Sequence, residues 1–393
     1  MSRAAPRHVF LSCGEASGDR YGARVVAALR RRDPDLRFTA LGGPLLEAAG
    51  VEIIQPSAAV AVMGVGEVAR ALPALLEARR RLDRHLANGA VDLFLPIDFP
   101  GFNGHLAAGA HRRGVPVFWL VAPQLWAWGG WRAASFRRRV DRLGTILPFE
   151  TAYFRDLGFD VEPLGHPLMD DYGNRFPFEP GLTRREERLN HRDGPLTIGL
   201  LPGSRRQELE ALLPVLKVTS QAITAHLAGR EVRFILSLAP GVDRSRVETL
   251  FTSAAEMTTE PLRELMPRLD LALVCSGTAS LEEALAGVPH EIVYRTGRVT
   301  AFLGRRLVKS PHIGLANLIL DKRVVREHLQ DEASPLPLAR ELLRWLARPA
   351  DRQAYYGEVR RLRQLCGAPG AWERAADAAM VMLDRGARAA GRP

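Results

Sequence analysis

Two carboxylates stand where an apolar segment gives way to a polar loop. Glu15 follows the apolar residues 9–13, and Asp98 follows the apolar residues 93–97. A carboxylate at the carboxyl end of a parallel strand faces ligands, and there it can accept the proton of an attacking hydroxyl. Asp98 could instead cap the helix that follows, a role that Asn103 could also take. We predict Asp98 as a general base and Glu15 as the second catalytic candidate.

Two glycine-containing turns in the second half of the chain have the composition of phosphate sites. Each follows an aliphatic segment and opens a helix, so free N–H groups of the first helical turn would point at an anion. The residues expected to bind phosphate are Gly203, Ser204, Arg205, Ser276, Gly277 and Thr278. Arg205 adds a planar guanidinium, which binds oxyanions at two points. Glu282, one turn into the second helix, could bind sugar hydroxyls or be a surface residue of a capped helix.

Aromatic and apolar residues form two further patterns, each with a structural and a functional explanation. Trp126 and Trp128, two residues apart in a loop, could stack on sugar rings or fill the core. An apolar stripe, largely at helical spacing, comprises Val62, Met63, Val65, Val68, Leu72, Leu75 and Leu76. Arginines follow it at positions 79, 80, 81 and 84. The stripe is either ordinary core or a contact with acyl chains and an anionic membrane surface.

The elements that must position these residues alternate between strand and helix. Strands are expected at residues 9–13, 38–41, 93–97, 115–121, 143–147, 197–201, 232–238, 271–275 and 291–294. Their nearly continuous apolar character is typical of parallel strands that are covered on both faces. Helical patterns such as residues 20–32, 66–86 and 102–113 lie between them. The sequence predicts an α/β protein with two doubly wound Rossmann-like domains facing across a cleft, and a helical C-terminus.

Composition suggests where the domains begin and end. Proline, glycine and charged residues interrupt the alternation at about residues 165–195. We predict an N-terminal acceptor or lipid domain over residues 1–170 and a linker over 171–195. A second Rossmann-like domain, with both phosphate turns, is expected over residues 196–340. Helices over residues 341–393 complete the chain, and they could pack back on the N-terminal domain.

Length and charge exclude several classes of protein. The chain has 393 residues, of which 47% are hydrophobic and 25% charged, so it is neither disordered nor fibrous and exceeds a single core. The formal net charge of +10 favours an anionic partner, either a phosphorylated substrate or an anionic membrane surface. Nucleic acid is not favoured, because aromatic residues are interleaved with arginines only around residues 126–142.

Membrane spans, disulfides and metals are not expected either. The sequence has no apolar run of about 18 residues, and its first residues do not resemble a signal peptide. Its three cysteines form no CxxC pair, and no cluster of His, Cys, Asp and Glu has metal-ligand spacing. We therefore predict no disulfide framework, no metal and no cofactor.

Nine short motifs occur in an order that resembles one known family. They are GEASGD (14–19), AVMG (61–64), D-x-P-x-F-N (98–103), P-x-x-WAW (123–128), LPFE (147–150), GHP (165–167), LPGSR (201–205), SGTASLE (276–282) and the segment 315–318. Together they resemble the lipid-A-disaccharide synthase family, from about residue 10 to residue 329. The resemblance implies a two-Rossmann, GT-B type glycosyltransferase, which is a hexosyltransferase of lipopolysaccharide and lipid A biosynthesis.

The reaction that the resemblance implies joins UDP-2,3-diacylglucosamine to 2,3-diacylglucosamine 1-phosphate. Its products are a β-1,6-linked disaccharide 1-phosphate and UDP, formed with inversion and without a metal. Asp98 matches the family's essential aspartate, Arg205 its phosphate-binding arginine and Asn317 its cleft asparagine, and Glu282 would contact the ribose. The resemblance also implies a cytoplasmic enzyme, peripheral on the inner membrane face, and a homodimer.

The chain departs from the family pattern at three places. Gly101 stands where a second aspartate is common, and Ala316 stands where a proline usually precedes the asparagine. Gly129-Gly130-Trp131 follows the WAW motif, where a charged segment is usual. The alternatives are another UDP-N-acetylglucosamine-using transferase or epimerase of the same fold, and a non-catalytic relative that binds anionic lipid.

Overall fold

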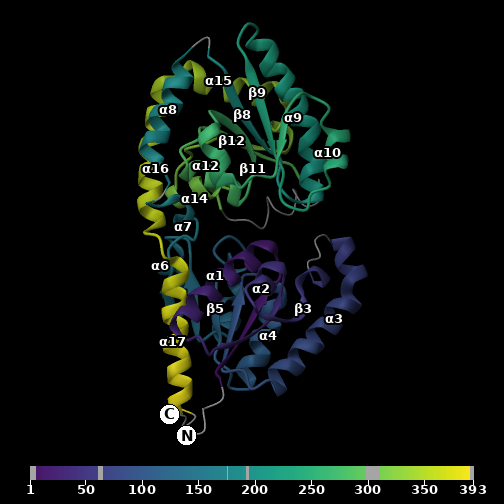
Figure 1. The fold of residues 1–393 in the computed structure, drawn as a ribbon, viewed down its shortest axis with the longest axis vertical. Helices are drawn as coiled ribbons and strands as arrows, with labels where there is room; N and C mark the ends of the chain where they lie inside the picture. The colour runs from purple at the N-terminus through teal and green to yellow at the C-terminus, as the bar shows by residue number, and fades with distance from the viewer. Residues whose placement is uncertain (1–5, 61–64, 175, 192–193, 298–309, 390–393) are drawn as a thin grey trace. The chain divides into compact units, whose positions relative to one another are not determined.

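The computed structural model describes residues 6–60, 65–174, 176–191, 194–297 and 310–389 (Figure 1). These residues form two compact units. Unit 1 comprises Met1–Pro167 and Gly370–Pro393, and unit 2 comprises Leu168–Pro369. The chain therefore passes between the units twice, once after Pro167 and once after Pro369.

Unit 1 contains a seven-stranded sheet, as far as the structure describes the chain, with the order β3-β2-β1-β4-β5-β6-β7. The strands are β1 (His8–Cys13), β2 (Arg37–Gly42), β3 (Glu52–Pro56), β4 (Leu93–Ile97), β5 (Phe118–Leu120), β6 (Arg142–Thr145) and β7 (Val161–Pro163). All of their pairings are parallel, and Cys13 lies opposite Ile97. Because β1 and β4 end side by side, the loops with Glu15 and Asp98 begin at the same edge.

Helices cover both faces of this sheet. They are α1 (Ala16–Arg32), α2 (Pro44–Ala48), α3 (Val65–Asn88), α4 (Pro100–Arg112), α5 (Ala133–Arg137), α6 (Glu150–Asp156) and α17 (Ala371–Ala389), with short 3-10 helices η1 (Ser57–Ala59) and η2 (Gly130–Arg132). One core cluster joins the sheet to α1 and α17, and a second cluster joins it to α3, α4, α5 and α6. Apolar side chains thus pack against both sides of the strands, as their nearly continuous apolar sequences predict.

Unit 2 contains a second parallel sheet, with the order β10-β9-β8-β11-β12-β13 among the described residues. The strands are β8 (Leu196–Leu201), β9 (Val232–Ser237), β10 (Glu256–Thr258), β11 (Leu271–Cys275), β12 (His290–Tyr294) and β13 (Glu327–Leu329). Leu201 lies opposite Val274 in the central pair. The two predicted phosphate turns, which follow these strands, therefore start at the same edge of the sheet.

The described helices between residues 169 and 366 belong to unit 2. They are α7 (Met169–Tyr172), α8 (Phe178–Asn190), α9 (Arg206–His226), α10 (Arg244–Leu250), α11 (Leu262–Leu265), α12 (Thr278–Leu285), α14 (Leu315–Leu320), α15 (Pro335–Ala347) and α16 (Pro349–Cys366), with η3 (Met266–Arg268) and η4 (Gln330–Glu332). Of the predicted C-terminal helices, α15 and α16 belong to unit 2. The final helix, α17, packs on α1 of unit 1, where Arg32 forms ion pairs with Glu373 and Asp377.

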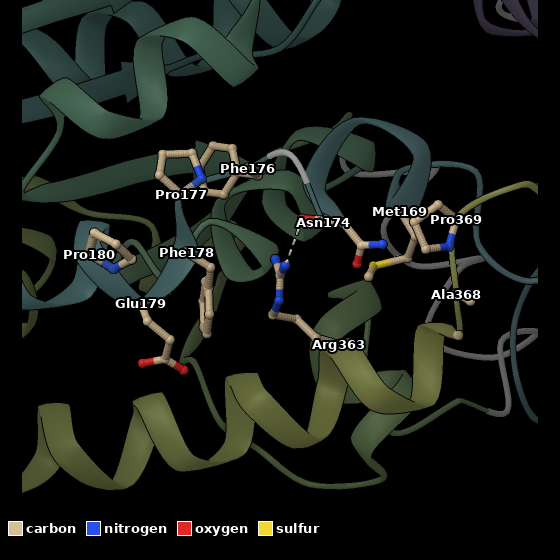
Figure 2. A pocket seen from close by; sticks show the side chains of 12 residues that line it. Met169, Asn174, Phe176, Pro177, Phe178, Glu179, Pro180, Arg363, Ala368 and Pro369 are labelled. Carbon is tan, nitrogen blue, oxygen red and sulfur yellow. Dashed lines mark hydrogen bonds between the residues drawn. The ribbon is translucent and has the colours of Figure 1, made fainter.

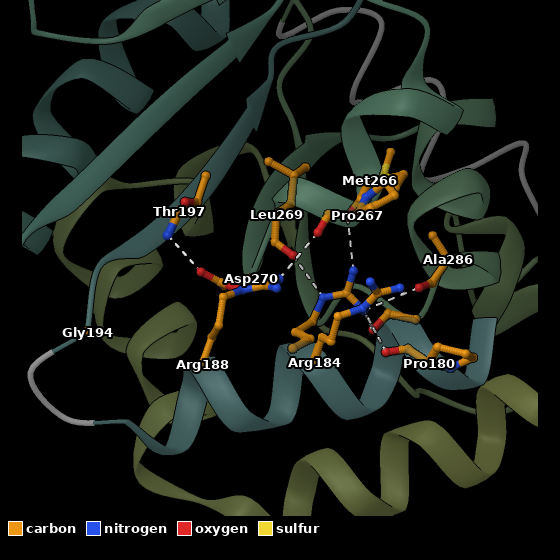
Figure 3. A network of polar contacts seen from close by, with 12 residues as sticks. Pro180, Arg184, Arg188, Gly194, Thr197, Met266, Pro267, Leu269, Asp270 and Ala286 are labelled. Atoms are coloured by element: carbon orange, nitrogen blue, oxygen red, sulfur yellow. Dashed lines mark hydrogen bonds and ion pairs between the residues drawn. The ribbon is translucent and has the colours of Figure 1, made fainter. Parts of the chain in front are cut away.

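The segment 171–195 is not a linker, contrary to the expectation from its composition. Its helix α8 is anchored in unit 2 by Arg185, which is 1% exposed. The guanidinium of Arg185 donates to four backbone carbonyls, those of Met266, Leu269, Ala286 and Gly287. Arg188 beside it pairs with Asp270, which also accepts the N–H of Thr197 (Figure 3). Detaching α8 would leave these buried polar groups unpaired, so the boundary lies at Pro167 instead of residue 170.

Candidate active site

Asp98 stands at the carboxyl end of β4, in a strained turn. Its φ is 49° and that of Phe99 is 55°, so two consecutive residues with side chains adopt the left-handed region. Such backbone costs roughly 1–3 kcal/mol per residue and is concentrated at functional sites. The N-cap residue of α4 is Phe99, and it makes no side-chain cap. Asp98 therefore does not occupy the N-cap position, and the role of general base still fits it.

Buried polar contacts hold this turn. Asn103 Nδ2 donates to the carbonyl oxygens of Asp98 (2.8 Å) and Ser12 (3.1 Å), and Ser12 Oγ donates to Asn103 Oδ1 (2.5 Å). A Cβ added to Gly14 would lie 2.2 Å from the Phe99 ring, so glycine is required where this ring covers the end of β1. The GEASGD and D-x-P-x-F-N motifs are thus parts of one packed structure.

The pKa of the Asp98 carboxyl suits the predicted role of general base. Burial, and then the negative charge of Glu15, raise the pKa of Asp98 to about 6. A base whose pKa lies slightly below the working pH is mostly deprotonated and still accepts a proton readily. Glu15 precedes α1 as its N-cap residue and makes no side-chain cap. In this structure Glu15 acts on the site through its charge.

A third carboxyl group, Glu150, escaped the sequence analysis of the site, although the LPFE motif contains it. It is 1% exposed at the start of α6. Its Oε2 accepts from the N–H groups of Ile146 (3.3 Å) and Leu147 (3.1 Å), and its Oε1 accepts from Trp126 Nε1 (3.1 Å). Burial raises the pKa of Glu150 to about 7, and the charge of Asp98 contributes. Glu150 therefore belongs to the same polar cluster as Asp98 and fixes Trp126.

The two predicted tryptophans have different surroundings. Trp126 packs on the core of unit 1 and lies edge-on to Phe149, with 5.0 Å between ring centroids. Trp128 is 48% exposed, and the guanidinium of Arg132 lies over its ring, 4.3 Å from the centroid. Core packing thus accounts for Trp126 and leaves Trp128 at the surface.

The first predicted phosphate turn, in unit 2, is shaped by Gly203 and Glu208. Gly203 has a φ of +97°, and a Cβ there would lie 2.4 Å from Glu208 Oε2. That oxygen accepts the N–H groups of Ser204 and Arg205, each at 3.1 Å. A carboxylate of the chain itself thus holds two of the amides that we expected to meet phosphate. The turn has the expected preference for an anion, and Glu208 satisfies it.

Arg205 is the exposed cation of this turn. Its side chain is 53% exposed, and its Nη1 lies 3.5 Å from Glu208 Oε1. An exposed guanidinium can reorient towards a phosphate and form charge-assisted hydrogen bonds with it. The structure therefore favours binding by the Arg205 side chain over binding by the two amides that Glu208 holds.

The second predicted phosphate turn joins β11 to α12. Ser276 Oγ donates to the carbonyl oxygen of Ile313 at 3.1 Å. Gly277 is exposed, and a Cβ added there would meet nothing within 4 Å among the described residues. Thr278 begins the helix, where the first N–H groups have no intrahelical acceptor. The turn is therefore open at Gly277 and Thr278, whereas the Ser276 hydroxyl bonds within the protein.

Glu282, the predicted ribose contact, is oriented by a residue that the sequence analysis missed. Its Oε2 accepts a hydrogen bond of 2.9 Å from the hydroxyl of Tyr172. Tyr172 is fully buried in α7. Burial and the charge of Glu282 raise the pKa of Tyr172 far above its usual range, so the phenol stays a donor. The glycines and prolines around Tyr172 indicated a linker, which hid this contact.

Asn317 is buried, and its amide is engaged within the protein. Its Nδ2 donates to Glu327 Oε1 (2.8 Å) and to the carbonyl oxygen of Val325 (2.8 Å). Its Oδ1 accepts from the N–H groups of Val324 (2.7 Å) and Val325 (3.0 Å). The structure thus gives Asn317 a positioning role, which differs from the direct ligand contact that we expected.

Glu327 carries this positioning to the second phosphate turn. Its carboxylate accepts the N–H groups of Ile313 (3.1 Å) and Gly314 (3.0 Å). The carbonyl of Ile313 is the acceptor for Ser276. Asn317 and Glu327 together therefore hold the backbone segment that packs against this turn.

The apolar stripe is described only in part. Two of its residues lie outside the described residues, and two in α3 have undescribed side chains: Val62, Met63, Val65 and Val68, respectively. Leu75 is partly buried against the core of unit 1. Leu72 is 49% exposed and Leu76 is 41% exposed. Ordinary core packing does not account for these two residues, and the membrane contact of the stripe stays a prediction.

A pocket of about 590 Å³ lies where the chain enters and leaves unit 2 (Figure 2). Arg363 lies over the Phe178 ring, 4.2 Å from its centroid, and donates to the carbonyl oxygen of Gly173 at 3.4 Å. The described lining includes none of the predicted site residues.

In the described part of the chain, no group of three or more His, Cys, Asp or Glu could hold a metal ion. No helix described there is long and apolar enough to cross a membrane.

The two sheets and their turns define a class of protein. MurG of Acinetobacter baumannii has a similar structure, with a TM-score of 0.56 and 18% identity, over 95% of this chain and 99% of that chain. The calicheamicin glycosyltransferase CalG4 has a TM-score of 0.59 and 17% identity, over 97% and 99% of the two chains. The chain thus has the GT-B fold of glycosyltransferases.

Sequence comparison narrows the class to one family. The model of the family described as "Lipid-A-disaccharide synthetase" matches residues 9–367. The lipid-A-disaccharide synthase of Syntrophus aciditrophicus is 36% identical over 384 residues, 96% of this chain and 98% of the relative. That of Geobacter metallireducens is 35% identical over 390 residues, 98% of this chain and 100% of the relative. The chain belongs to the lipid-A-disaccharide synthase family, whose members are hexosyltransferases of lipid A biosynthesis. The resemblance seen in the nine motifs is confirmed, and the alternatives are not favoured.

Proposed function

We propose that the protein transfers 2,3-diacylglucosamine from UDP to the 6-hydroxyl of 2,3-diacylglucosamine 1-phosphate. The products are the β-1,6 disaccharide 1-phosphate and UDP. The observation that carries this proposal is the partly buried Asp98 carboxyl, with its pKa raised to about 6, in a chain of this family. A carboxyl of this kind suits a reaction that needs a single general base.

Asp98 takes the proton of the acceptor hydroxyl as that oxygen attacks the anomeric carbon. The bond from the anomeric carbon to the UDP oxygen breaks, and UDP leaves with the electron pair. Because the attack comes from the face opposite UDP, the anomeric centre inverts and no covalent sugar–enzyme intermediate is needed. The negative charge of Glu15 raises the pKa of Asp98 further than burial alone would raise it.

Unit 2 binds the donor in this proposal. The Arg205 guanidinium binds the pyrophosphate and stabilises the charge that develops on UDP. The N–H groups at Gly277 and Thr278 offer a second contact for phosphate. Glu282 binds the ribose hydroxyls, and Tyr172 orients it.

Both substrates carry acyl chains, so we place the enzyme on the cytoplasmic face of the inner membrane. Leu72 and Leu76 are exposed on α3, and arginines follow them on the same helix. An apolar stripe beside basic residues suits a shallow contact with an anionic bilayer. A homodimer is a separate part of the proposal, and sedimentation of the purified protein tests it.

Product analysis tests the reaction. Purified protein is incubated with both diacylated substrates, and the products are identified by mass. We expect UDP and disaccharide 1-phosphate in equal amounts, and no disaccharide when the acceptor is omitted. A donor without acyl chains serves as the control for substrate class. Release of UDP with no disaccharide, or equal use of the unacylated donor, would contradict the proposal.

Flotation with vesicles tests the membrane contact. Leu72→Ser combined with Leu76→Ser should reduce binding to anionic vesicles, because the apolar contribution is lost. The affinity for UDP should not change, since both residues belong to unit 1 and the proposed donor residues belong to unit 2. Unaltered flotation would assign the contact to another surface.

A further inference from the structure

The stretch of residues 128–138 in unit 1 includes two exposed tryptophans. η2 runs directly into α5, just after the P-x-x-WAW motif. Trp131 is 85% exposed and Trp128 is 48% exposed. Tryptophan is highly buried on average in soluble proteins, so two exposed indoles close together mark an interaction surface.

This stretch has an inner and an outer face. Ala133 and Phe136 are buried in the core of unit 1. Trp131 and Arg138 are seven residues apart, which is about two helical turns, so they lie on one face, roughly 10 Å from each other. Both residues are exposed, as is Ala134 between them. The outer face thus has an indole at one end and a guanidinium at the other.

The arginines of this stretch keep their positive charge unpaired by acids. Among the described residues, Arg132, Arg137 and Arg138 form no ion pair with a carboxylate. Arg132 lies over the Trp128 ring, and Arg137 approaches only a backbone carbonyl, at 3.5 Å. The exposed Arg244 of unit 2 differs, because it pairs with Glu248 one turn later. The stretch therefore combines amphipathic aromatic rings with uncompensated positive charge.

We propose that this stretch is an interfacial anchor for an anionic lipid surface, distinct from the stripe on α3. Its members are Trp128, Trp131, Arg132, Arg137 and Arg138. Indole rings settle at the level of lipid headgroups, where one edge is apolar and the N–H meets water, and guanidinium groups attract anionic headgroups. The inference rests on the proposed membrane location of the enzyme.

The position of the anchor after strand β5 indicates what it could do for the reaction. β5 pairs with β4 in parallel, so the loop that leads to Trp131 leaves the sheet at the edge where Asp98 stands. A lipid-linked acceptor that enters from the bilayer would meet the protein at this edge. The anchor would hold Asp98, the proposed general base in unit 1, close to the membrane surface from which the acceptor comes.

Vesicle binding of the full chain tests the anchor. The probes are vesicles of phosphatidylcholine alone and of phosphatidylcholine mixed with phosphatidylglycerol. Trp131→Ser should weaken binding to the mixed vesicles about tenfold, through the loss of buried apolar area. Arg137→Gln with Arg138→Gln should weaken it about fivefold per arginine, and only where phosphatidylglycerol is present. Leu336→Ser, at a 72% exposed leucine of unit 2, is the matched control for Trp131, and Arg244→Gln is the control for the arginines.

Fluorescence gives a second readout that a change in stability would not imitate. Lipids brominated near the headgroup should quench the emission of the protein, and Trp131→Phe should remove part of this quenching while binding is largely kept. Turnover on detergent-dispersed substrates should be unchanged in every anchor variant, because none of these residues is placed in the chemistry.

Several results would overturn the anchor. One is vesicle binding and quenching that do not depend on Trp131. Another is a changed oligomeric state in the Trp131 variants without vesicles, which would assign this face to a second copy of the chain. If the Leu72 and Leu76 variants lose binding but the Trp131 variants do not, the anchor fails while the proposed membrane location stands. If the unaltered protein forms no disaccharide product, that result would instead contradict the proposed function.

Discussion

The turn at Asp98 in unit 1 and the turn at Arg205 in unit 2 follow the same plan, from a parallel strand through a turn into a helix. Their environments are opposite. The Asp98 turn is packed under Phe99, fixed by Asn103 and strained at two residues. At the other turn, more than half of the Arg205 side chain is exposed, and the amides are satisfied by Glu208.

The difference fits the role that we propose for each side chain. A carboxylate becomes a useful base when burial raises its pKa, and this needs tight packing and a rigid backbone. A guanidinium that must find a phosphate is charged at any relevant pH and works best when a ligand can reach it. The predictions below test this contrast, from the largest expected effect to the smallest.

The largest effect is expected for Asp98→Asn. The amide has the size of the carboxyl and cannot take the proton of the acceptor, so turnover should fall by about 10²–10⁴-fold. UDP affinity, measured by calorimetry, should be unchanged. Turnover close to that of the unaltered protein would remove Asp98 as the base, and Glu15 would be tested next.

Arg205→Ala should mainly weaken donor binding. Loss of a charge-assisted hydrogen bond costs about 1.5–3 kcal/mol, which corresponds to a roughly 10- to 150-fold higher dissociation constant for UDP. Arg206→Ala is the matched control, because that side chain is 72% exposed and pairs with Glu210. Equal losses in the two variants would show a general effect of charge and not a phosphate contact.

Tyr172→Phe should give a smaller change in the same direction. The ring can still pack beside Phe176, but the hydrogen bond to Glu282 is lost, so the KM for the donor should rise about 2- to 10-fold while kcat stays similar. Tyr153→Phe is the matched control, because it removes a hydroxyl from unit 1, and the KM for the donor should not change. A donor KM that does not respond to the loss of the Tyr172 hydroxyl would contradict its role in orienting Glu282.

The smallest effect on activity concerns its dependence on pH. Because the pKa of Asp98 is raised to about 6, turnover should rise with pH through about 6 and level off above it. Glu15→Gln removes a negative charge that raises this pKa, so the acid limb of the pH profile should move to lower pH. A limb that stays in place would remove Glu15 from the electrostatics of the site.

The same shift predicts the sign of a stability change. The ordinary pKa of 3.8 rises to about 6 on folding, so ionised Asp98 disfavours the folded state by up to about 3 kcal/mol. This cost is absent below pH 4, appears as the pH rises, and is complete above 6. Asp98→Asn should therefore unfold at the same or a higher temperature than the unaltered protein at pH 7.5. A markedly lower unfolding temperature would show that the carboxylate is itself structural.

The sequence by itself determined the two parallel sheets, and it predicts Asp98 and Arg205 as the principal site residues. Long aliphatic segments such as β1, β4, β8 and β11 were predicted close to their observed bounds, because burial on both faces leaves a local signature. Asp98 directly follows β4, and Arg205 lies in the turn after β8, which is why the sequence singles out both residues. β3, β7, β10 and β13 were missed. They are the outermost strands of the two described sheets, and a glutamate interrupts the aliphatic pattern in each of them. Pairing with a neighbouring strand defines them more than their own composition does.

The tertiary structure decided which polar groups meet. Arg185 anchors α8 through carbonyls that lie 81 to 102 residues further along the chain, so a segment that reads as a linker is part of a domain. Tyr172 reaches Glu282 across 110 residues, and Trp126 reaches Glu150 across 24. No local pattern encodes these contacts, because a buried hydrogen bond depends on two partners that only the folded backbone brings together. The pKa of Asp98 is decided in the same way, since burial and the charge of Glu15 arise only when β1 and β4 lie side by side.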